Sequence, residues 1–487
     1  MIKKIVIGLI GLMIIIGGLV GIQWIVFYKD AKNTEKTQNI NLEIETGLVH
    51  KNGQLFVTQT VSKLAQNHFL IRLPLDAKSV ECILADKETL TLKDGASLQR
   101  IDVGANSFVT FNYKLPVDES KSYGWFETGF VQFFTDDREA IAANFHVTVS
   151  EETDKSITWI SGAVSEAQVD KEYLTYFAWT KNNTTEFPLY MSKEPLKKIE
   201  VYEPNIYLFI QNRSGDESLF TSFKDWYKRL PDKNGLTIIQ ANDDQVYLAP
   251  LLVVVPKHID KDKLEELAIQ AYLLNYKKPK TDKISWVWNV LPAFILERPV
   301  GQNKEFEMSK ELLENLKQDV KMAFADWLLK NNNNYTEISL ENLDEQLSKF
   351  SQLQTMYFTE NDNKDERAVP LYYVDRRQVY YGQRRIGTDW NTIIKKKEIY
   401  FPFVETMERI GFKIQYFPES QVYLLTKEEN SWKFYLNEKK YNYNQQEFML
   451  TNLPLEEIGE NVYISEQMIE SLLKIEVIKR EQTIYLR

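Results

Sequence analysis

The segment IVIGLIGLMIIIGGLVGIQWIVF, residues 5–27, determines how the rest of the chain is interpreted. It contains no charged residue, and Gln23 is its only strongly polar side chain. A helix of this length, rising about 1.5 Å per residue, crosses a hydrocarbon core of about 30 Å. Trp24 and Tyr28 lie at its far end, where amphipathic aromatic rings favour the lipid headgroups. The segment therefore predicts a transmembrane helix, a signal-anchor over residues 1–28.

A cleaved signal peptide and a buried core helix are the alternatives for this segment. The apolar region of a signal peptide spans about 7–15 residues and ends at small residues. Here the apolar run is longer, and it ends in QWIVFYKD at residues 23–30. Lys3 and Lys4 favour a cytoplasmic N-terminus, although three lysines between residues 29 and 36 weaken this bias. We therefore expect a single-pass protein of the cell membrane with an extracytoplasmic body.

Composition limits the classes of partner. The chain has 487 residues, enough for about three domains, and a net charge of -10 that is spread along its length. Nucleic-acid binding needs a basic face, so the charge argues against a nucleic-acid partner. Cys82 is the one cysteine, which excludes an intramolecular disulfide. An exported protein without disulfides fits a bacterial surface better than a eukaryotic secretory route.

Beyond the anchor, we expect an α+β multidomain protein. Residues 29–38 are polar and form a linker. Residues 39–150 contain short alternating apolar runs separated by turns such as Lys51-Asn52-Gly53, which predicts a β-sandwich. Residues 151–360 begin with strand-like runs and continue with helical periods, which predicts a mixed α+β domain.

Three helices are predicted in this middle domain. Residues 264–274 place apolar side chains on one face. Residues 308–330 form the clearest helical pattern, with Ser309 near its start. A further helix is expected from residue 340 to about residue 356, with Ser339 as its N-cap.

Residues 368–487 contain an internal repeat, with copies at 396–425 and 459–487. Each copy is expected to form a strand, an amphipathic helix, a strand, a turn and another strand. The corresponding residues are Tyr400 and Tyr463, Phe401 and Ile464, Ile410 and Leu473, and Ile414 and Val477.

This repeat resembles the copper amine oxidase N-terminal-like domain, or stalk domain, of Gram-positive surface proteins. Residues 400–403 (YFPF) match the family's Tyr-Val-Pro-Leu element, and residues 410–414 (IGFKI) match its helix end and following strand. Residues 381–383 (YGQ) resemble its turn. The second copy departs from the pattern, because Ser465 replaces the proline and Lys474 replaces the glycine.

The resemblance implies an extracytoplasmic α/β module used for spacing, wall association or binding. It does not imply copper or a quinone cofactor. The sequence agrees, because residues 368–487 contain no histidine and a copper site would need imidazole ligands.

The central region resembles, in degenerate form, the core of aminopeptidase N-like zinc metallopeptidases. The resemblance rests on residues 265–270 (EELAIQ) and on residues 286–297 (WVWNVLPAFILE). Such an enzyme needs two histidines at i and i+4, a glutamate as general base and a third ligand from the next helix. The positions that correspond to these four groups are Glu265, Ile269, Glu266 and Val290, in that order.

Only Glu266 matches the chemistry, so the resemblance implies a pseudoenzyme without zinc. The alternative is an ordinary amphipathic helix that happens to read EELA. His50, His68, His146 and His258 are scattered, and no two of them have metal-ligand spacing.

These observations predict a membrane-anchored, extracytoplasmic, non-catalytic binding or scaffold protein of the bacterial cell envelope. We expect no cofactor and no metal, and a cell-wall polymer or an envelope protein as partner. Two alternatives stay open: a zinc metallopeptidase-like enzyme with unrecognised ligands, and a sensor or assembly factor that signals through the single helix.

Overall fold

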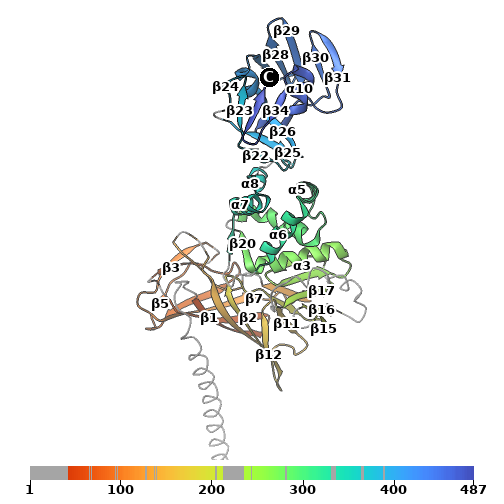
Figure 1. Ribbon diagram of the computed structural model, residues 1–487. Coiled ribbons are helices and arrows are strands. Elements are labelled where there is room, and N and C mark those ends of the chain that lie inside the picture. Colours follow the sequence, from red (N-terminus) through yellow and green to blue (C-terminus); the bar gives the residue numbers. More distant parts are fainter. Residues whose placement is uncertain are drawn as a thin grey trace, which may run out of the picture.

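The computed structural model describes most of the chain after residue 41 (Figure 1). It covers residues 42–487, apart from residues 65, 67, 94, 96, 127–128, 137, 139, 203–205, 212–234, 243, 280–281, 331–335, 363–366 and 388–389. The predicted anchor, residues 5–27, and the predicted linker, residues 29–38, lie outside the described residues. No helix among the described residues is long and apolar enough to span a membrane.

The N-terminal body is built on an eight-stranded sheet in the order β12-β13-β10-β1-β2-β7-β4-β5. Its strands are β1 (Leu42–Lys51), β2 (Gln54–Ser62), β4 (Lys78–Leu84), β5 (Thr89–Leu90), β7 (Phe108–Pro116), β10 (Ala143–Glu151), β12 (Val164–Asp170) and β13 (Thr175–Thr184). β1 and β10 are parallel, and the other neighbouring strands are antiparallel. The predicted turn between β1 and β2 is confirmed, with Asn52 at φ 51° and Gly53 at φ 67°, the conformation of a tight hairpin.

Two three-stranded sheets, β6-β3-β9 and β11-β14-β8, pack against the large sheet. Their strands are β3 (His68–Arg72), β6 (Gln99–Asp102), β8 (Tyr123–Phe126), β9 (Gln132–Phe134), β11 (Thr158–Ser161) and β14 (Leu189–Ser192). The layers share one apolar core, in which the ring of Phe133 makes edge-on contacts with Phe69 and Phe111 at 5.7 and 5.9 Å. The N-terminal body is therefore a β-sandwich.

The sandwich extends to Ser192, so the domain boundary predicted at residue 150 is wrong. β13 pairs along its length with β10, and Trp159 of β11 is buried in the sandwich core. Alternation along a strand indicates which residues face a core, but it does not indicate which sheet the strand joins. The sequence pattern alone therefore does not separate the strands after residue 150 from the helices that follow them.

The middle body contains a five-stranded sheet in the order β15-β16-β17-β19-β18. Its strands are β15 (Leu196–Tyr202), β16 (Ile206–Gln211), β17 (Leu236–Ala241), β18 (Tyr247–Ala249) and β19 (Leu252–Pro256). β16, β17 and β19 are parallel, and all six residues of β17 are buried, as expected for a parallel strand covered on both faces. One face packs on the sandwich strands β11 and β14 through Ile239 and Val254, and the other packs on helices.

Seven helices and one short strand pair complete the described part of this body. They are α3 (Lys261–Tyr276), η3 (Asp282–Asn289), α4 (Pro292–Leu296), α5 (Asn303–Asn315), α6 (Gln318–Leu329), α7 (Leu340–Ser351) and α8 (Tyr357–Glu360), with β20 (Lys277–Pro279) and β21 (Thr336–Ile338). The helix predicted at 264–274 is confirmed as α3. Ser339 caps α7 as predicted, and its hydroxyl accepts a hydrogen bond from the backbone N–H of Asn342.

The single helix predicted over residues 308–330 is wrong, because it is divided into α5 and α6. Leu316 has extended backbone angles that interrupt the helix, and the break allows Phe324 of α6 to contact Phe294 of α4 at 4.5 Å between ring centroids. Ser309 does not start a helix. It lies buried inside α5, where its Oγ accepts a hydrogen bond from the backbone N–H of Val300 at 2.9 Å.

The described residues of the C-terminal body form three sheets and two helices. The sheet orders are β22-β25-β26-β33-β32, β24-β23-β35-β34 and β27-β28-β29-β30-β31. The elements are β22 (Tyr373–Asp375), β23 (Gln378–Tyr381), β24 (Arg384–Arg385), β25 (Thr392–Lys395), β26 (Glu398–Pro402), α9 (Phe403–Arg409), β27 (Lys413–Phe417), β28 (Val422–Lys427), β29 (Asn430–Tyr435), β30 (Lys440–Tyr443), β31 (Gln446–Met449), β32 (Glu456–Ile458), β33 (Asn461–Ser465), α10 (Glu466–Leu473), β34 (Val477–Lys479) and β35 (Thr483–Leu486).

The predicted repeat is confirmed, because β26-α9-β27-β28 and β33-α10-β34-β35 have the same order of elements. The strand pair that joins the two copies has local two-fold symmetry. β26 and β33 pair antiparallel with Phe401 opposite Ile464, which are the corresponding residues of the two copies. Tyr400 and Tyr463 lie symmetrically on either side of this pair.

The second copy has other residues than the first at two turn positions but keeps the same order of elements. Pro402 precedes α9, whereas Ser465 precedes α10 and caps it by accepting a hydrogen bond from a backbone N–H. Gly411 follows α9 at φ 96°, and Lys474 follows α10 at φ 57°. Both helices therefore end in a left-handed residue, a conformation that glycine adopts at less cost than lysine.

Candidate functional site

Helix α3 carries three of the four positions predicted from the metallopeptidase resemblance. Asp260 caps the helix by accepting hydrogen bonds from the backbone N–H groups of Asp262 (2.9 Å) and Lys263 (3.3 Å). Residues 264–273 are all buried, because the sheet lies on one side of α3 and other helices lie on the other. The polar residues Glu265 and Glu266 are therefore enclosed in the middle body.

Both glutamates already have cationic partners. The carboxylate of Glu266 accepts a hydrogen bond from Lys263 Nζ at 2.7 Å and another from Gln270 Nε2 at 3.4 Å. The carboxylate of Glu265 lies 3.3 Å from the guanidinium of Arg298. Each carboxylate thus neutralises a neighbouring cation, as a buried charge requires.

The other two predicted positions are apolar core. Ile269 and Val290 are 1% and 0% exposed, and both belong to the main core of the middle body. The structure brings α3 close to the second predicted segment, where Gln270 Nε2 donates to Asn289 Oδ1 at 3.2 Å. Within the described residues, no three His, Cys, Asp or Glu side chains are grouped to hold a metal ion. Glu265, Glu266, Gln270 and Asn289 therefore belong to polar contacts inside an apolar core.

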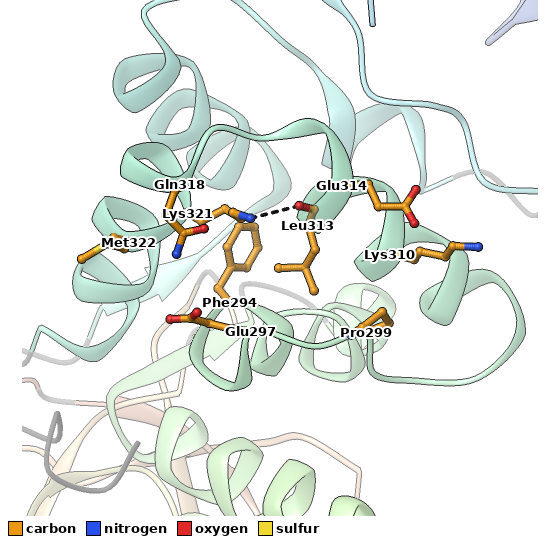
Figure 2. A pocket seen from close by; sticks show the side chains of 9 residues that line it. All are labelled: Phe294, Glu297, Pro299, Lys310, Leu313, Glu314, Gln318, Lys321 and Met322. Carbon is orange, nitrogen blue, oxygen red and sulfur yellow. Dashed lines mark hydrogen bonds between the residues drawn. The ribbon is translucent and has the colours of Figure 1, made fainter. Parts of the chain in front are cut away.

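A cavity of about 400 Å³ lies where α4 ends and where α5 gives way to α6 (Figure 2). It is lined by Phe294, Glu297, Pro299, Lys310, Leu313, Glu314, Gln318, Lys321 and Met322. Figure 2 shows Phe294 and Leu313 at its centre, with Met322 on one side and Lys310 on the other. Lys321 Nζ donates a hydrogen bond to the backbone oxygen of Leu313 at 3.1 Å, which satisfies a carbonyl near the end of α5.

This first cavity combines an apolar floor with charges of both signs. Two lysines and two glutamates line it, and Glu314 and Met322 are exposed at its rim. Its lining offers both anionic and cationic side chains. The arrangement can hold a small molecule with both a positive and a negative group.

A second cavity, of about 300 Å³, lies between the sandwich and the middle body. It is lined by Gly162, Ala163, Val164, Glu166, Thr180, Lys181, Asn182, Leu251 and Asn275. Lys181 is its buried cation, only 7% exposed, and its Nζ donates to the backbone oxygen of Pro250 at 3.2 Å. Burial lowers the pKa of Lys181 from 10.5 to about 7, and the negative charge of Glu186 opposes this shift.

Sequence reasoning did not identify Lys181, although the sequence contains a signal for it. Phe177, Trp179 and Lys181 alternate along β13, so they point to the same face of the strand. Phe177 and Trp179 are buried aromatic residues, and Lys181 is the next residue on the same buried face of the strand. A lysine in register with a buried stripe predicts a buried amine.

The C-terminal body presents a row of aromatic rings across its third sheet. Neighbouring strands place the five rings opposite one another in register, in the order Tyr416, Tyr423, Phe434, Tyr441 and Phe448. The first two rings stack at 4.4 Å between centroids, and the last two at 5.2 Å. The centre of the row is buried, whereas its ends are 41% and 39% exposed.

Comparison with known proteins finds a similarity for one part of the chain. Residues 381–486 match the family model described as the copper amine oxidase N-terminal domain. The match confirms the resemblance predicted for the C-terminal region and covers most of the C-terminal body. A search of curated proteins found no match. The resemblance of the central region to zinc metallopeptidases is not shown by these comparisons.

Proposed function

We propose that this protein is a membrane-anchored, extracytoplasmic, non-catalytic binding or scaffold protein of the bacterial cell envelope. The observation that carries the proposal is the match of residues 381–486 to the copper amine oxidase N-terminal domain. This domain is an accessory, non-catalytic domain. The residues predicted from a peptidase resemblance support the same conclusion, because Glu266 is paired with Lys263 inside a core.

The order of the bodies supports a role as a spacer. In Figure 1 the sandwich that begins at Leu42 lies at one end of the described chain, and the C-terminal body lies at the other, with the middle body between them. A membrane anchor at residues 5–27 would hold the sandwich near the lipid. The C-terminal body would then be the part farthest along the chain from the membrane.

The joint between the last two bodies has its own small core. Val369 and Tyr372, which lead into the C-terminal body, pack with Tyr400 and Tyr463 of the two repeat copies. Glu360 at the end of α8 accepts a hydrogen bond from Tyr372; burial raises the pKa of that tyrosine, and the negative charge of Glu360 adds to this effect. Such a packed joint suits a domain that is held in position rather than tethered by a free linker.

The exposed ends of the aromatic row are the proposed contact surface for an envelope polymer. The rings of Tyr416 and Phe448 are each stacked on an inner neighbour, so they are held in place before a ligand arrives. Flat rings that are exposed and pre-ordered bind through large apolar contact at a low entropic cost.

Surface labelling of intact cells tests the location of the body. Native Cys82 is 0% exposed, and burial raises the pKa of its thiol to about 12, so it should not react with a maleimide. Met449 is 75% exposed and lies in the C-terminal body. In a Gram-positive host, the full-length Met449→Cys variant should react with a membrane-impermeant maleimide in intact cells, whereas the unsubstituted protein should not. Labelling only after lysis would refute an extracytoplasmic body.

Co-sedimentation with purified cell-wall sacculi tests the partner. We expect the full-length protein, solubilised in mild detergent, to sediment with the sacculi. The double variant Tyr416→Ala/Phe448→Ala should remain in solution. Phe306→Ala is the matched control, because Phe306 is a similarly exposed ring (40%) in the middle body. Equal sedimentation of all three proteins would exclude the aromatic row as the contact surface.

A further inference from the structure

We propose that the cavity around Lys181 is a covalent binding site for a small aldehyde or ketone, which the amine captures reversibly as an imine. The inference is independent of the proposed envelope function, because it concerns the junction of the sandwich and middle bodies. It rests on the position of the amine, on its neighbours and on the chemistry that a buried amine can perform.

Two backbones approach closely at the wall of the cavity, which Gly162 and Leu251 both line. A Cβ atom added to Gly162 would lie 2.7 Å from the backbone of Leu251 and from the carbonyl oxygen of Pro250. Glycine at this position therefore lets the segment between β11 and β12 pass directly over the turn before β19. The same approach brings the Pro250 carbonyl to Lys181 Nζ, where it orients the amine by one hydrogen bond.

Two acidic residues among the described ones are relevant to the charge of the amine, Glu186 and Glu166. The negative charge of Glu186 favours the protonated form of Lys181 but does not outweigh burial. Glu166 also lines the cavity, but its carboxylate accepts a hydrogen bond from Thr180 and lies 3.5 Å from the ring of His146. With a pKa of about 7, a large share of Lys181 is the neutral amine at neutral pH.

A neutral amine is a nucleophile, and buried lysines with a lowered pKa form Schiff bases with carbonyl compounds. The nitrogen of Lys181 would attack the carbonyl carbon of the ligand. The carbonyl oxygen then leaves as water with both amine protons, and a C=N bond replaces the C=O bond. No oxidant or reductant is needed, and water reverses the reaction. A volume of about 300 Å³ suits a small ligand, and Asn182 and Asn275 line the cavity as hydrogen-bonding side chains.

Reductive alkylation of the full-length protein tests the proposal. The protein is incubated at pH 7 with propanal and cyanoborohydride, and each lysine is quantified by peptide mass spectrometry over time. Lys433, an exposed lysine in the C-terminal body, is the internal control. We expect Lys181 to be alkylated at least ten-fold faster than Lys433 at pH 7, and this advantage to shrink as the pH approaches 10.

Two further comparisons decide the interpretation. Val164 lines the cavity and is 56% exposed, so Val164→Trp should narrow the entrance and slow alkylation of Lys181 without affecting Lys433. Lys181→Arg keeps a cation but removes the primary amine, and it should abolish the fast-reacting site. Alkylation of Lys181 at the rate of Lys433 or slower, in the unsubstituted protein at pH 7, would overturn the proposal.

Discussion

Substitution of Glu151 by alanine should destabilise the sandwich by about 2–6 kcal/mol, because it leaves two buried polar groups without their partner at a cost of about 1–3 kcal/mol each. Glu151 is 0% exposed at the end of β10. Its carboxylate lies 2.7 Å from His50 Nδ1 of β1 and accepts a hydrogen bond from Trp159 Nε1 of β11 at 2.9 Å. The backbone N–H of Thr153 also donates to it at 2.8 Å.

The expected loss of stability follows from the polar groups of His50 and Trp159, which lose their partner when the carboxylate of Glu151 is removed. His50 is 2% exposed and Trp159 is 4% or less exposed, so neither ring nitrogen could replace the carboxylate with bulk water. A buried polar group left without a partner costs about 1–3 kcal/mol, and two such groups account for most of the expected loss. Thr153 is exposed, so its backbone N–H should find water at a lower cost.

Denaturant unfolding followed by tryptophan fluorescence measures this loss in the full-length protein. Glu152→Ala is the matched control, because Glu152 is the next residue but forms only a solvent-exposed ion pair with Lys51 at 3.4 Å. The control should change the free energy of unfolding by no more than about 0.5 kcal/mol. If Glu151→Ala behaved like Glu152→Ala, the network would not hold β11 to β10, and the assignment of residues after 150 to the sandwich would lose its energetic basis.

Three other substitutions test separate features. The pKa of Lys181 is about 7 in the folded protein against an ordinary value of 10.5, so the unfolded chain binds more protons between these pH values and the stability of the protein should rise with pH there. Lys181→Met should therefore be more stable than the unsubstituted protein at pH 7. Denaturant unfolding at several pH values should show that this difference vanishes towards pH 10. Gly162→Ala should lower stability by about 1–3 kcal/mol because its Cβ would meet the backbone of Leu251, and an unchanged melting temperature would contradict the close approach. Lys474→Gly should raise the stability of the C-terminal body by about 0.5–1 kcal/mol, because lysine is held there at φ 57°. Gly411→Lys should lower the stability, because Gly411 lies at φ 96° in the other copy. Calorimetry of both variants checks that the two changes have opposite signs.

Local patterns predicted the local structure well. The hairpin at Asn52–Gly53 follows from turn residues that accept a positive φ, and the N-cap at Ser339 follows from a hydroxyl placed before an apolar period. The repeat was recognisable because each copy contains the same sequence of apolar periods. In these cases the residues that specify the structure are neighbours in the chain.

The errors arose where distant residues decide the structure. No glycine or proline marks the break at Leu316, which instead follows from the packing of Phe324 on Phe294. The extent of the sandwich depends on the pairing of β13 with β10, which alternation does not reveal. The pattern of β13 indicates that Lys181 is buried, but the cavity beside it is formed with residues near Gly162 and Leu251, which are distant in the sequence and do not follow from that strand.

The local two-fold symmetry of the strand pair β26 and β33 in the C-terminal body has an evolutionary consequence. Where Phe401 lies opposite Ile464, each strand meets its own counterpart, as in the interface of a symmetric homodimer. A single half-length ancestor could have associated with itself through this same pair of strands. Gene duplication and fusion would then have joined two subunits into one polypeptide. After such a fusion each half can diverge separately, and the two halves differ here at Pro402 and Ser465 and at Gly411 and Lys474.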